Sequence, residues 1–332
     1  MRSVYLNKDK RIGSVYAPET LQCLKTAAGL EPIAYSYEDI AADPQSFADV
    51  EYVFSTWGMP VFTAEEVKNW FPGLKAVFYA AGTVQYFAKP FLENGVKVFS
   101  AWAANAVPVA EYTVAQIILA NKGFFSSSRI AKTGDRKAAS QCFHSYPGNY
   151  GAKVGIIGAG MIGKLVINML KSYNLEVLVF DPFLPDEKAK ELGVRKVSLP
   201  EVFKECQVVS NHLANNEQTQ GMLHGKLFQM MLPFATFINT GRGAQVVESD
   251  LISALKSRPD LTALLDVTLP EPPESDSEFY TLPNCVLTPH IAGSAGNEVR
   301  RMSEYMMEEY QNFIHNKPCK YEVTLEMLKT MA

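Results

Sequence analysis

The sequence has no excess of positive charge and no run rich in lysine or arginine. Its 332 residues include 31 Lys and Arg against 35 Asp and Glu, which gives a formal net charge of −4. Proteins that bind nucleic acids usually carry a clustered basic excess. We therefore expect no nucleic-acid partner for this chain.

Cysteine is scarce, and no two cysteines form a C-x-x-C pair. The cysteines are odd in number and irregular in spacing, which is typical of free thiols in a reducing cytoplasm. We therefore predict a cytoplasmic location and no metal site. No pattern identifies one of these residues as a nucleophile. The five are Cys23, Cys142, Cys206, Cys285 and Cys319.

Long uncharged apolar runs are also absent. The apolar stretch at the N-terminus ends at Asn7, which is too early for a signal peptide. The most apolar later stretch, residues 101–120, contains Pro108 and Glu111. We interpret it as a buried helix rather than a membrane span, and we expect no membrane association.

What the sequence does have is an alternation of short apolar runs with helical patterns in both halves of the chain. The composition, 47% hydrophobic and 20% charged, is that of a globular protein, and the chain is longer than one core usually holds. Strand–helix alternation predicts parallel sheets covered by helices on both faces. The predicted fold class is α/β, with two doubly wound, Rossmann-like domains and an interdomain cleft. Strands are expected at residues 3–6, 32–35, 50–55, 75–79, 96–100, 153–157, 176–180, 208–211, 236–239, 261–266 and 286–287.

Two helical patterns set the predicted domain boundaries. One covers residues 107–122, with Pro108 in its first turn, where proline is tolerated. The other, residues 296–315, carries one apolar stripe and is expected to return to the first domain. We therefore predict a discontinuous first domain, 1–106 plus 300–332, and a second domain, 107–299. Further helices are expected at 19–28, at 64–70 after a capping box of Thr63 and Glu66, and at 161–173, whereas 123–151 is expected to be irregular.

A glycine-rich motif follows the first strand of the second domain. Residues 154–163, VGIIGAGMIG, contain G-x-G-x-x-G directly after an apolar strand and directly before a helical pattern. Gly158 permits the tight turn, Gly160 lets the backbone approach a pyrophosphate, and Gly163 allows close packing of helix and strand. The start of the helix also offers N–H groups to phosphates. This arrangement predicts a dinucleotide site.

An acidic residue after the second strand of this domain indicates whether the dinucleotide is NAD or NADP. The next strand, residues 176–180, is followed by Asp181. A carboxylate there can accept hydrogen bonds from ribose hydroxyls and would repel a 2′-phosphate. The predicted cofactor is therefore NAD rather than NADP.

Three segments of the second domain lie at the ends of expected strands and carry residues suited to keto-acid chemistry. Reduction of a 2-keto acid by NADH needs a cation for the carboxylate, a donor to the ketone and an acid for the nascent alkoxide. Ligands bind at the carboxyl ends of strands in doubly wound sheets. Arg242 lies in NTGRG (239–243), Glu271 follows LDV (265–267), and His290 lies in TPHIAG (288–293).

These motifs, in this order and together with VAE at residues 109–111, resemble the D-isomer-specific 2-hydroxyacid dehydrogenase family over nearly the whole chain. The resemblance implies that Arg242 binds the substrate carboxylate and polarises the ketone. The planar guanidinium can donate two hydrogen bonds side by side, which the ammonium group of lysine cannot do. His290 would be the acid/base. Glu271 would hydrogen-bond His290, orient its ring and keep it protonated for reduction.

The resemblance also implies the other binding residues and partners. The protein would be an NAD-dependent oxidoreductase acting on a small 2-keto or 2-hydroxy acid, and a homodimer formed through the second domain and the region 126–144. Asp266 would lie near the nicotinamide ribose or ring. His212 would lie at a strand end near the cofactor, where a cofactor contact and a purely structural role are both open. Substrate contacts would come from the backbone of Ala81 and Gly82 and from Arg242, and we expect a further contact from Trp57 if its side chain faces the cleft. Cofactor contacts would come from Gly158, Gly160, Met161, Ile162, Gly163, Asp181, His212, Thr219, Thr240, Gly241, Asp266 and Gly293.

The chain departs from the family pattern at three places. Thr83 and Val84 follow Gly82 where the family often has Val-Asp, and Ala214 stands where proline is usual. Trp57 is bulky where many relatives have small polar residues, and it could narrow the substrate choice or cover an apolar tail. The alternatives left open are an NAD-sensing, corepressor-like binding protein without significant turnover, formate oxidation and phosphonate oxidation.

Overall fold

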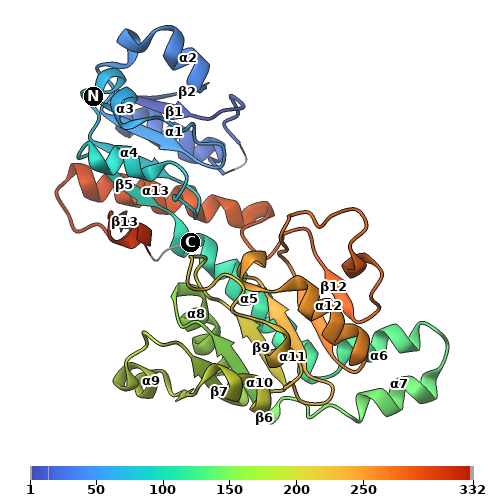
Figure 1. Cartoon of the computed structure of the whole chain (residues 1–332). Helices are drawn as coiled ribbons and strands as arrows, with labels where there is room; N and C mark the ends of the chain where they lie inside the picture. Colours follow the sequence, from blue (N-terminus) through green and yellow to red (C-terminus); the bar gives the residue numbers. More distant parts are fainter. Residues whose placement is uncertain (1, 14, 330–332) are drawn as a thin grey trace. The chain divides into compact units, whose positions relative to one another are not determined.

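The computed structural model describes residues 2–13 and 15–329, which divide into two compact units (Figure 1). Unit 1 contains the residues up to Asn105 together with those from Ser294 onward, and unit 2 contains Ala106–Gly293. The prediction set the boundaries after residues 106 and 299. Its last segment includes 330–332, which lie outside the described residues. Each unit contains its own sheet, and the predicted α/β, Rossmann-like fold class is confirmed.

Unit 1 is built on a six-stranded sheet in the order β13-β5-β4-β3-β1-β2. All five predicted strands are present and run parallel, and β1, β3 and β4 are buried along their whole length, as expected for strands covered on both faces. The sixth, β13, was not predicted and pairs antiparallel with β5 at the edge. The strands are β1 Ser3–Leu6, β2 Leu30–Tyr35, β3 Tyr52–Ser55, β4 Ala76–Tyr79, β5 Lys97–Ser100 and β13 Glu322–Val323.

Helices cover this sheet, and the last long helix belongs to its core. In α13, Met302, Met306 and Tyr310 are fully buried, and the ring of Tyr310 packs on those of Phe54 and Phe78. The predicted apolar stripe therefore does return to the first unit. The predicted capping box of Thr63 and Glu66 is also confirmed. The helices are α1 Pro18–Ala28, α2 Tyr37–Ala42, α3 Ala64–Trp70, α4 Ala88–Glu93 and α13 Val299–Ile314, with short 3₁₀ turns at Pro44–Phe47, Gly296–Glu298 and Met327–Lys329.

Unit 2 is built on a seven-stranded parallel sheet in the order β12-β11-β10-β9-β6-β7-β8. The chain goes from β6 to β7 on one side and later returns to β9 on the other. The carboxyl ends of β6 and β9 therefore mark a topological switch point, the position where ligands bind in such sheets. The strands are β6 Tyr150–Ile157, β7 Asn174–Phe180, β8 Arg195–Lys196, β9 Val208–Asn211, β10 Thr236–Asn239, β11 Thr262–Leu265 and β12 Cys285–Leu287.

The helices of unit 2 include two that the prediction treated as irregular chain. Residues 123–151 contain α6 and α7, so that expectation was wrong. Each of these helices is only 8 residues long, and α7 has no buried residue while α6 has only one, so neither contributes a long core-facing pattern to the sequence. The helices are α6 Phe124–Ala131, α7 Arg136–Phe143, α8 Met161–Leu170, α9 Asp186–Leu192, α10 Leu199–Glu205, α11 Gly225–Phe228 and α12 Glu248–Ser257, with 3₁₀ turns at Gly243–Gln245 and Glu278–Tyr280.

The helix α5 (Trp102–Asn121) begins earlier than predicted, so Pro108 lies inside it rather than in its first turn. The alanine-rich residues before the proline favour helix, and they extend it despite the hydrogen bond that proline removes. By length and composition α5 could cross a membrane, but 50% of that stretch is buried inside the protein. Ala110, Val114 and Ile117 lie in the core of unit 2.

Candidate active site

The glycine-rich turn between β6 and α8 has the geometry of a dinucleotide site. Gly158 has a φ of +91°, and a Cβ added there would lie 2.7 Å from the carbonyl oxygen of His212. A Cβ on Gly163 would lie 2.0 Å from the carbonyl oxygen of Gly158. On Gly160, by contrast, an added Cβ would meet nothing within 4 Å. Two glycines thus serve packing, while the open side of the third fits the close approach of a pyrophosphate.

Asp181 stabilises this turn from the end of β7. Its Oδ2 accepts a hydrogen bond from the Ala159 N–H at 2.7 Å, and its Oδ1 accepts from the N–H groups of Phe183 and Leu184 at 2.8 and 3.1 Å. Sequence reasoning missed this bracing role. Each carboxylate oxygen has further acceptor capacity, so hydrogen bonds to a ribose stay a prediction.

His212 lies beside the turn, at the end of β9. Its side chain is buried, with 8% exposed, and its Nε2 is 2.9 Å from Ser210 Oγ. Burial lowers the pKa of His212 to about 4, so the ring is neutral near pH 7. The hydroxyl of Thr219 donates to the carbonyl of Ala214 at 2.7 Å and fixes the following loop. In this structure both side chains have structural partners, and their contacts with NAD stay predictions.

Arg242 lies in the turn after β10. Its Nη1 donates to the carbonyl of Gly241 at 2.7 Å. Burial lowers the pKa of Arg242 and the nearby Glu271 carboxylate opposes that shift, but an arginine remains protonated at any ordinary pH. Thr240 contacts helix α5, because its Oγ1 lies 3.3 Å from Thr113 Oγ1.

Glu271 lies in the loop after β11 and His290 lies in the loop after β12, and their side chains are in contact. Nδ1 of His290 lies 2.5 Å from Oε1 of Glu271, with the two side chains 46% and 40% exposed. Glu271 is flanked by the cis peptide bonds Leu269–Pro270 and Glu271–Pro272. The electrostatic effect of Glu271 on Arg242 places all three predicted catalytic side chains in one region of unit 2.

Asp266 holds the segment that carries His290. Its buried carboxylate accepts hydrogen bonds from Thr288 Oγ1 at 2.6 Å, from the Ile291 N–H at 2.8 Å and from the Ala292 N–H at 2.9 Å. The N–H of His290 also donates to the Asp266 carbonyl. His290 has a φ of +54°, a conformation that side chains other than glycine adopt at a cost. Sequence reasoning placed Asp266 near the nicotinamide and missed that it stabilises this conformation; the nicotinamide contact stays a prediction.

The predicted substrate residues of unit 1 follow β3 and β4. The N–H of Ala81 donates to the Tyr79 carbonyl at 2.9 Å, so that amide already has a partner in the chain. Ser100 Oγ donates to the carbonyls of Ala81 and Gly82 and fixes the loop. Trp57 is 49% exposed, in a turn held by Asn7 Nδ2, which donates to the Trp57 carbonyl at 2.8 Å.

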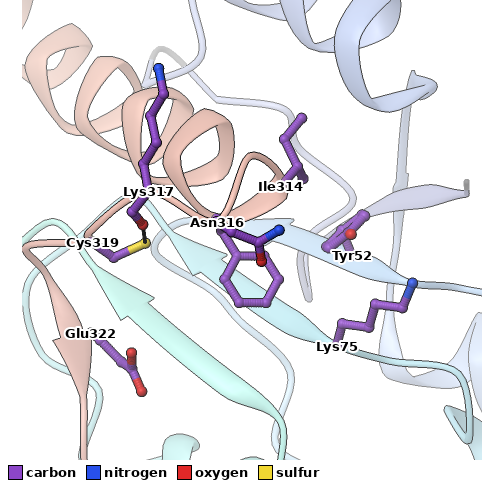
Figure 2. Close-up of a pocket in the computed structure, with 8 residues that line it drawn as sticks. Tyr52, Lys75, Ile314, Asn316, Lys317, Cys319 and Glu322 are labelled. Atoms are coloured by element: carbon purple, nitrogen blue, oxygen red, sulfur yellow. Dashed lines mark hydrogen bonds between the residues drawn. The ribbon is translucent and has the colours of Figure 1, made fainter.

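A surface groove of unit 1 contains none of the predicted site residues (Figure 2). Two of its charged lining residues form ion pairs, Lys75 with Glu51 and Glu322 with Lys97. Burial raises the pKa of the Cys319 thiol to about 11, so it is not a thiolate nucleophile at neutral pH. Among residues 2–13 and 15–329, no group of His, Cys, Asp and Glu could hold a metal ion.

Comparison with known proteins agrees with this geometry. Residues 114–292 match the family model described as D-isomer specific 2-hydroxyacid dehydrogenase, NAD binding domain. The chain is similar to the "Putative 2-hydroxyacid dehydrogenase YoaD" of Bacillus subtilis, with 32% identity over 232 residues, 69% of this chain and 64% of that protein. It is also similar to D-3-phosphoglycerate dehydrogenase of Archaeoglobus fulgidus, with 28% identity over 71% of this chain and 44% of that protein. The matches thus span less than two thirds of each of these relatives.

Solved structures show the same fold. Apo D-mandelate dehydrogenase of Rhodotorula graminis superposes with a TM-score of 0.81 at 21% identity, and the match covers 97% of each chain. Unit 2 therefore contains an NAD-binding domain of this fold, with the glycine-rich turn, Asp181, Arg242 and Glu271 inside the matched residues.

Proposed function

The chain belongs to the D-isomer specific 2-hydroxyacid dehydrogenase family, and we propose that it transfers hydride between NAD and a small 2-keto or 2-hydroxy acid. The observation that carries this proposal is the contact of 2.5 Å between His290 and Glu271, with Arg242 under the electrostatic influence of the same carboxylate. A cation, an acid/base and an orienting carboxylate are what the reaction requires of the protein.

In the reductive direction, bound NADH supplies the hydride that C2 of the keto acid receives. Arg242 binds the substrate carboxylate and donates a hydrogen bond to the ketone oxygen, which stabilises the negative charge that develops there. His290 delivers a proton from Nε2 to that oxygen. Because Nδ1 is held by Glu271, Nε2 is the nitrogen available to the substrate.

The turn from Gly158 to Gly163 would hold NAD. The open side of Gly160 leaves room for the pyrophosphate, and the N–H groups of Met161 and Ile162, the first residues of α8, would bind it. Asp181 would accept hydrogen bonds from the ribose and disfavour a 2′-phosphate. Contacts from Thr240 and Gly241 after β10, Asp266 after β11 and Gly293 after β12 would complete the proposed set.

Two positions of unit 1 complete the proposed substrate contacts, Gly82 through its backbone N–H and Trp57 through its side chain. Since the N–H of Ala81 is bonded to Tyr79, Gly82 is the stronger candidate of the loop. Trp57 would select among keto acids by the size of their tails. The variant Trp57→Ala tests this by changing the relative KM values of short and long keto acids.

A homodimer and a cytoplasmic location are part of the proposal. Helices α6 and α7 bear exposed aromatic residues, Phe124 and Phe143, that a second copy could cover. All five cysteines are free, which suits a reducing compartment. Analytical ultracentrifugation tests the dimer directly.

The experiment for the reaction measures loss of NADH absorbance with a panel of 2-keto acids, while NADH binding is measured by fluorescence. Turnover of at least one keto acid, with NADH strongly preferred to NADPH, is expected. Tight NADH binding without turnover of any of them would contradict the proposal and favour an NAD-sensing binding protein. Formate and phosphonate, assayed with NAD, test the two other oxidations found in this family.

A further inference from the structure

The backbone of Arg242 is held on both sides by buried side-chain amides. Its N–H donates to Oε1 of Gln245 at 3.2 Å, and its carbonyl accepts from Nδ2 of Asn239 at 3.1 Å. Gln245 is fully buried and Asn239 nearly so. Both peptide groups of the proposed substrate-binding arginine thus have side-chain partners, where a loop residue would commonly have water.

A third buried amide, that of Asn211 at the end of β9, fixes the orientation of the other two. Its Nδ2 donates to Oδ1 of Asn239 at 3.0 Å and to Oε1 of Gln245 at 2.5 Å. Oδ1 of Asn239 also accepts from the N–H of Gly241 at 3.1 Å. Because the three amides satisfy one another, none can flip without leaving a buried group unpaired.

The turn around Arg242 has almost no room to move. A Cβ added to Gly241 would lie 2.8 Å from Oε1 of Gln245, and one added to Gly243 would lie 2.0 Å from the backbone carbon of Thr268. The amide cluster therefore packs directly against one side of the turn, and the Thr268 backbone packs against the other. This packing fixes the position of the backbone of Arg242, from which the side chain extends.

Gln245 also joins this turn to the loop after β9. Its Nε2 donates to the carbonyls of Leu213 and Ala214 at 2.7 and 3.0 Å. That loop has a second support, since Thr219 Oγ1 donates to the Ala214 carbonyl. Loss of Gln245 would therefore leave the loop supported but would leave the Arg242 N–H without its acceptor.

We propose that Gln245, together with Asn211, is a positioning residue for Arg242, and that it sets the affinity for the substrate carboxylate. This inference rests on the proposed function. The role differs from general stabilisation because the amides bond to the main chain of the arginine itself. A displacement of about 1 Å at a substrate-binding group can cost up to about a hundredfold in rate. Holding the backbone of Arg242 in a fixed position should therefore have a measurable effect on the kinetics.

The test variant is Gln245→Met, which keeps the length of the side chain and removes its hydrogen bonds. We expect KM for the best keto acid to rise about tenfold or more, while kcat falls less and the Kd for NADH stays unchanged. Oxamate, an unreactive analogue of a 2-keto acid, is titrated into the protein saturated with NADH, and its Kd should rise by the same factor. This second readout does not depend on turnover.

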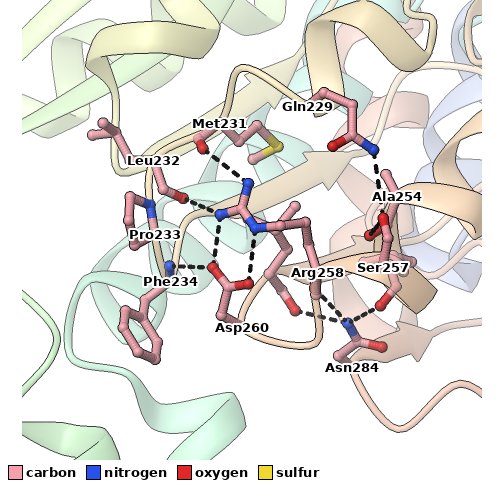
Figure 3. A network of polar contacts seen from close by, with 12 residues as sticks. Gln229, Met231, Leu232, Pro233, Phe234, Ala254, Ser257, Arg258, Asp260 and Asn284 are labelled. Atoms are coloured by element: carbon pink, nitrogen blue, oxygen red, sulfur yellow. Dashed lines mark hydrogen bonds and ion pairs between the residues drawn. The ribbon is translucent and has the colours of Figure 1, made fainter.

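The matched control comes from another buried amide in the same unit. Asn284, which precedes β12, donates to the carbonyls of Leu255 and Leu261 beside the ion pair of Arg258 and Asp260 (Figure 3). This network lies at the amino ends of the strands, whereas Arg242 follows the carboxyl end of β10. Asn284→Leu should lower the melting temperature at least as much as Gln245→Met and leave KM and oxamate affinity unchanged.

A second variant keeps the proposal testable if Gln245→Met folds poorly. Gln245→Asn keeps an amide for the neighbouring polar groups but shortens the side chain by one CH₂ group, which moves the acceptor away from the Arg242 N–H. The same rise in KM and in the oxamate Kd supports the proposal. Unchanged values in a folded variant, or an equal change in Asn284→Leu, would overturn it. A wild-type protein that neither reduces a keto acid nor binds oxamate contradicts the proposed function itself, and the positioning role with it.

Discussion

Nδ1 of His290 lies 2.5 Å from Oε1 of Glu271. About half of each side chain is exposed, and an ion pair exposed to this degree usually contributes little to stability. The pair is nevertheless held in place, because the backbone of His290 has a left-handed conformation that Asp266 stabilises through three side-chain hydrogen bonds to the same segment. We interpret this arrangement as orientation of the histidine for proton transfer.

Replacing Glu271 by Gln should reduce kcat about 10- to 100-fold without lowering the melting temperature, because the carboxylate that orients His290 is lost at an exposed position. Steady-state kinetics and thermal unfolding measure the two effects. Glu274→Gln, an exposed acid in the same loop, is the matched control and should behave as wild type. Equal activity of the two variants would contradict the assigned role of Glu271.

Most of the candidate site could be predicted from the sequence because its motifs are local. Gly158, Gly160 and Gly163 lie within six residues of one another, and each of Arg242 and His290 lies within a short recognisable segment. The partners of Asp266 could not be predicted in this way. Its acceptor contacts with Ile291 and Ala292 join residues that are distant in the sequence, and only the adjacency of β11 and β12 brings them together.

The fold could be predicted to the level of its sheets, and the errors have physical causes. Buried parallel strands are short apolar runs between polar residues, so β9 and β10 were placed correctly. Helix α7 was missed because it is only 8 residues long and buries no side chain, although Asp135 caps it by accepting from the Ala138 N–H. Gln245 and Asn211 were missed because a buried amide has no signature in a single sequence.

Replacing Asp266 by Asn should lower both stability and catalysis. The amide directs an NH₂ group at an N–H or hydroxyl donor, and a buried unsatisfied group costs about 1–3 kcal/mol. We expect a matching drop in the free energy of unfolding, measured with urea, and a fall in kcat. The Kd for NADH should rise as well, because Asp266 also belongs to the proposed cofactor contacts. A variant whose free energy of unfolding stays unchanged would contradict the assigned role of Asp266 in holding the segment of His290.

Two glycine variants separate the binding function of the glycine-rich turn from its packing. Gly160→Ala adds a methyl group into open space, so the melting temperature should be unchanged while NADH binding is strongly weakened. Gly163→Ala places the same group 2.0 Å from the Gly158 carbonyl oxygen, so it should destabilise the protein. Thermal unfolding and NADH titration of both variants test this. Normal NADH affinity in Gly160→Ala would contradict a pyrophosphate site at this turn.

His212 should make the protein less stable in mild acid. Its pKa is lowered to about 4 in the folded state, while an unfolded histidine titrates near 6.5. Between these values the unfolded state binds more protons, so stability is lost as the pH falls from about 6.5 toward 4, by up to about 3 kcal/mol. Urea unfolding at several pH values measures this loss. His212→Gln should show a shallower decline over that range, and an identical decline in the two proteins would contradict the assignment.

In the proposed reaction His290 and Arg242 act on a keto acid beside bound NADH. The most direct measurement is kcat/KM for the best keto acid in wild type, His290→Ala and Arg242→Ala, with the Kd for NADH determined for each. We predict a loss of about 10²- to 10⁴-fold in each variant, with NADH affinity close to that of wild type. Variants that turn over the keto acid as fast as wild type would contradict it.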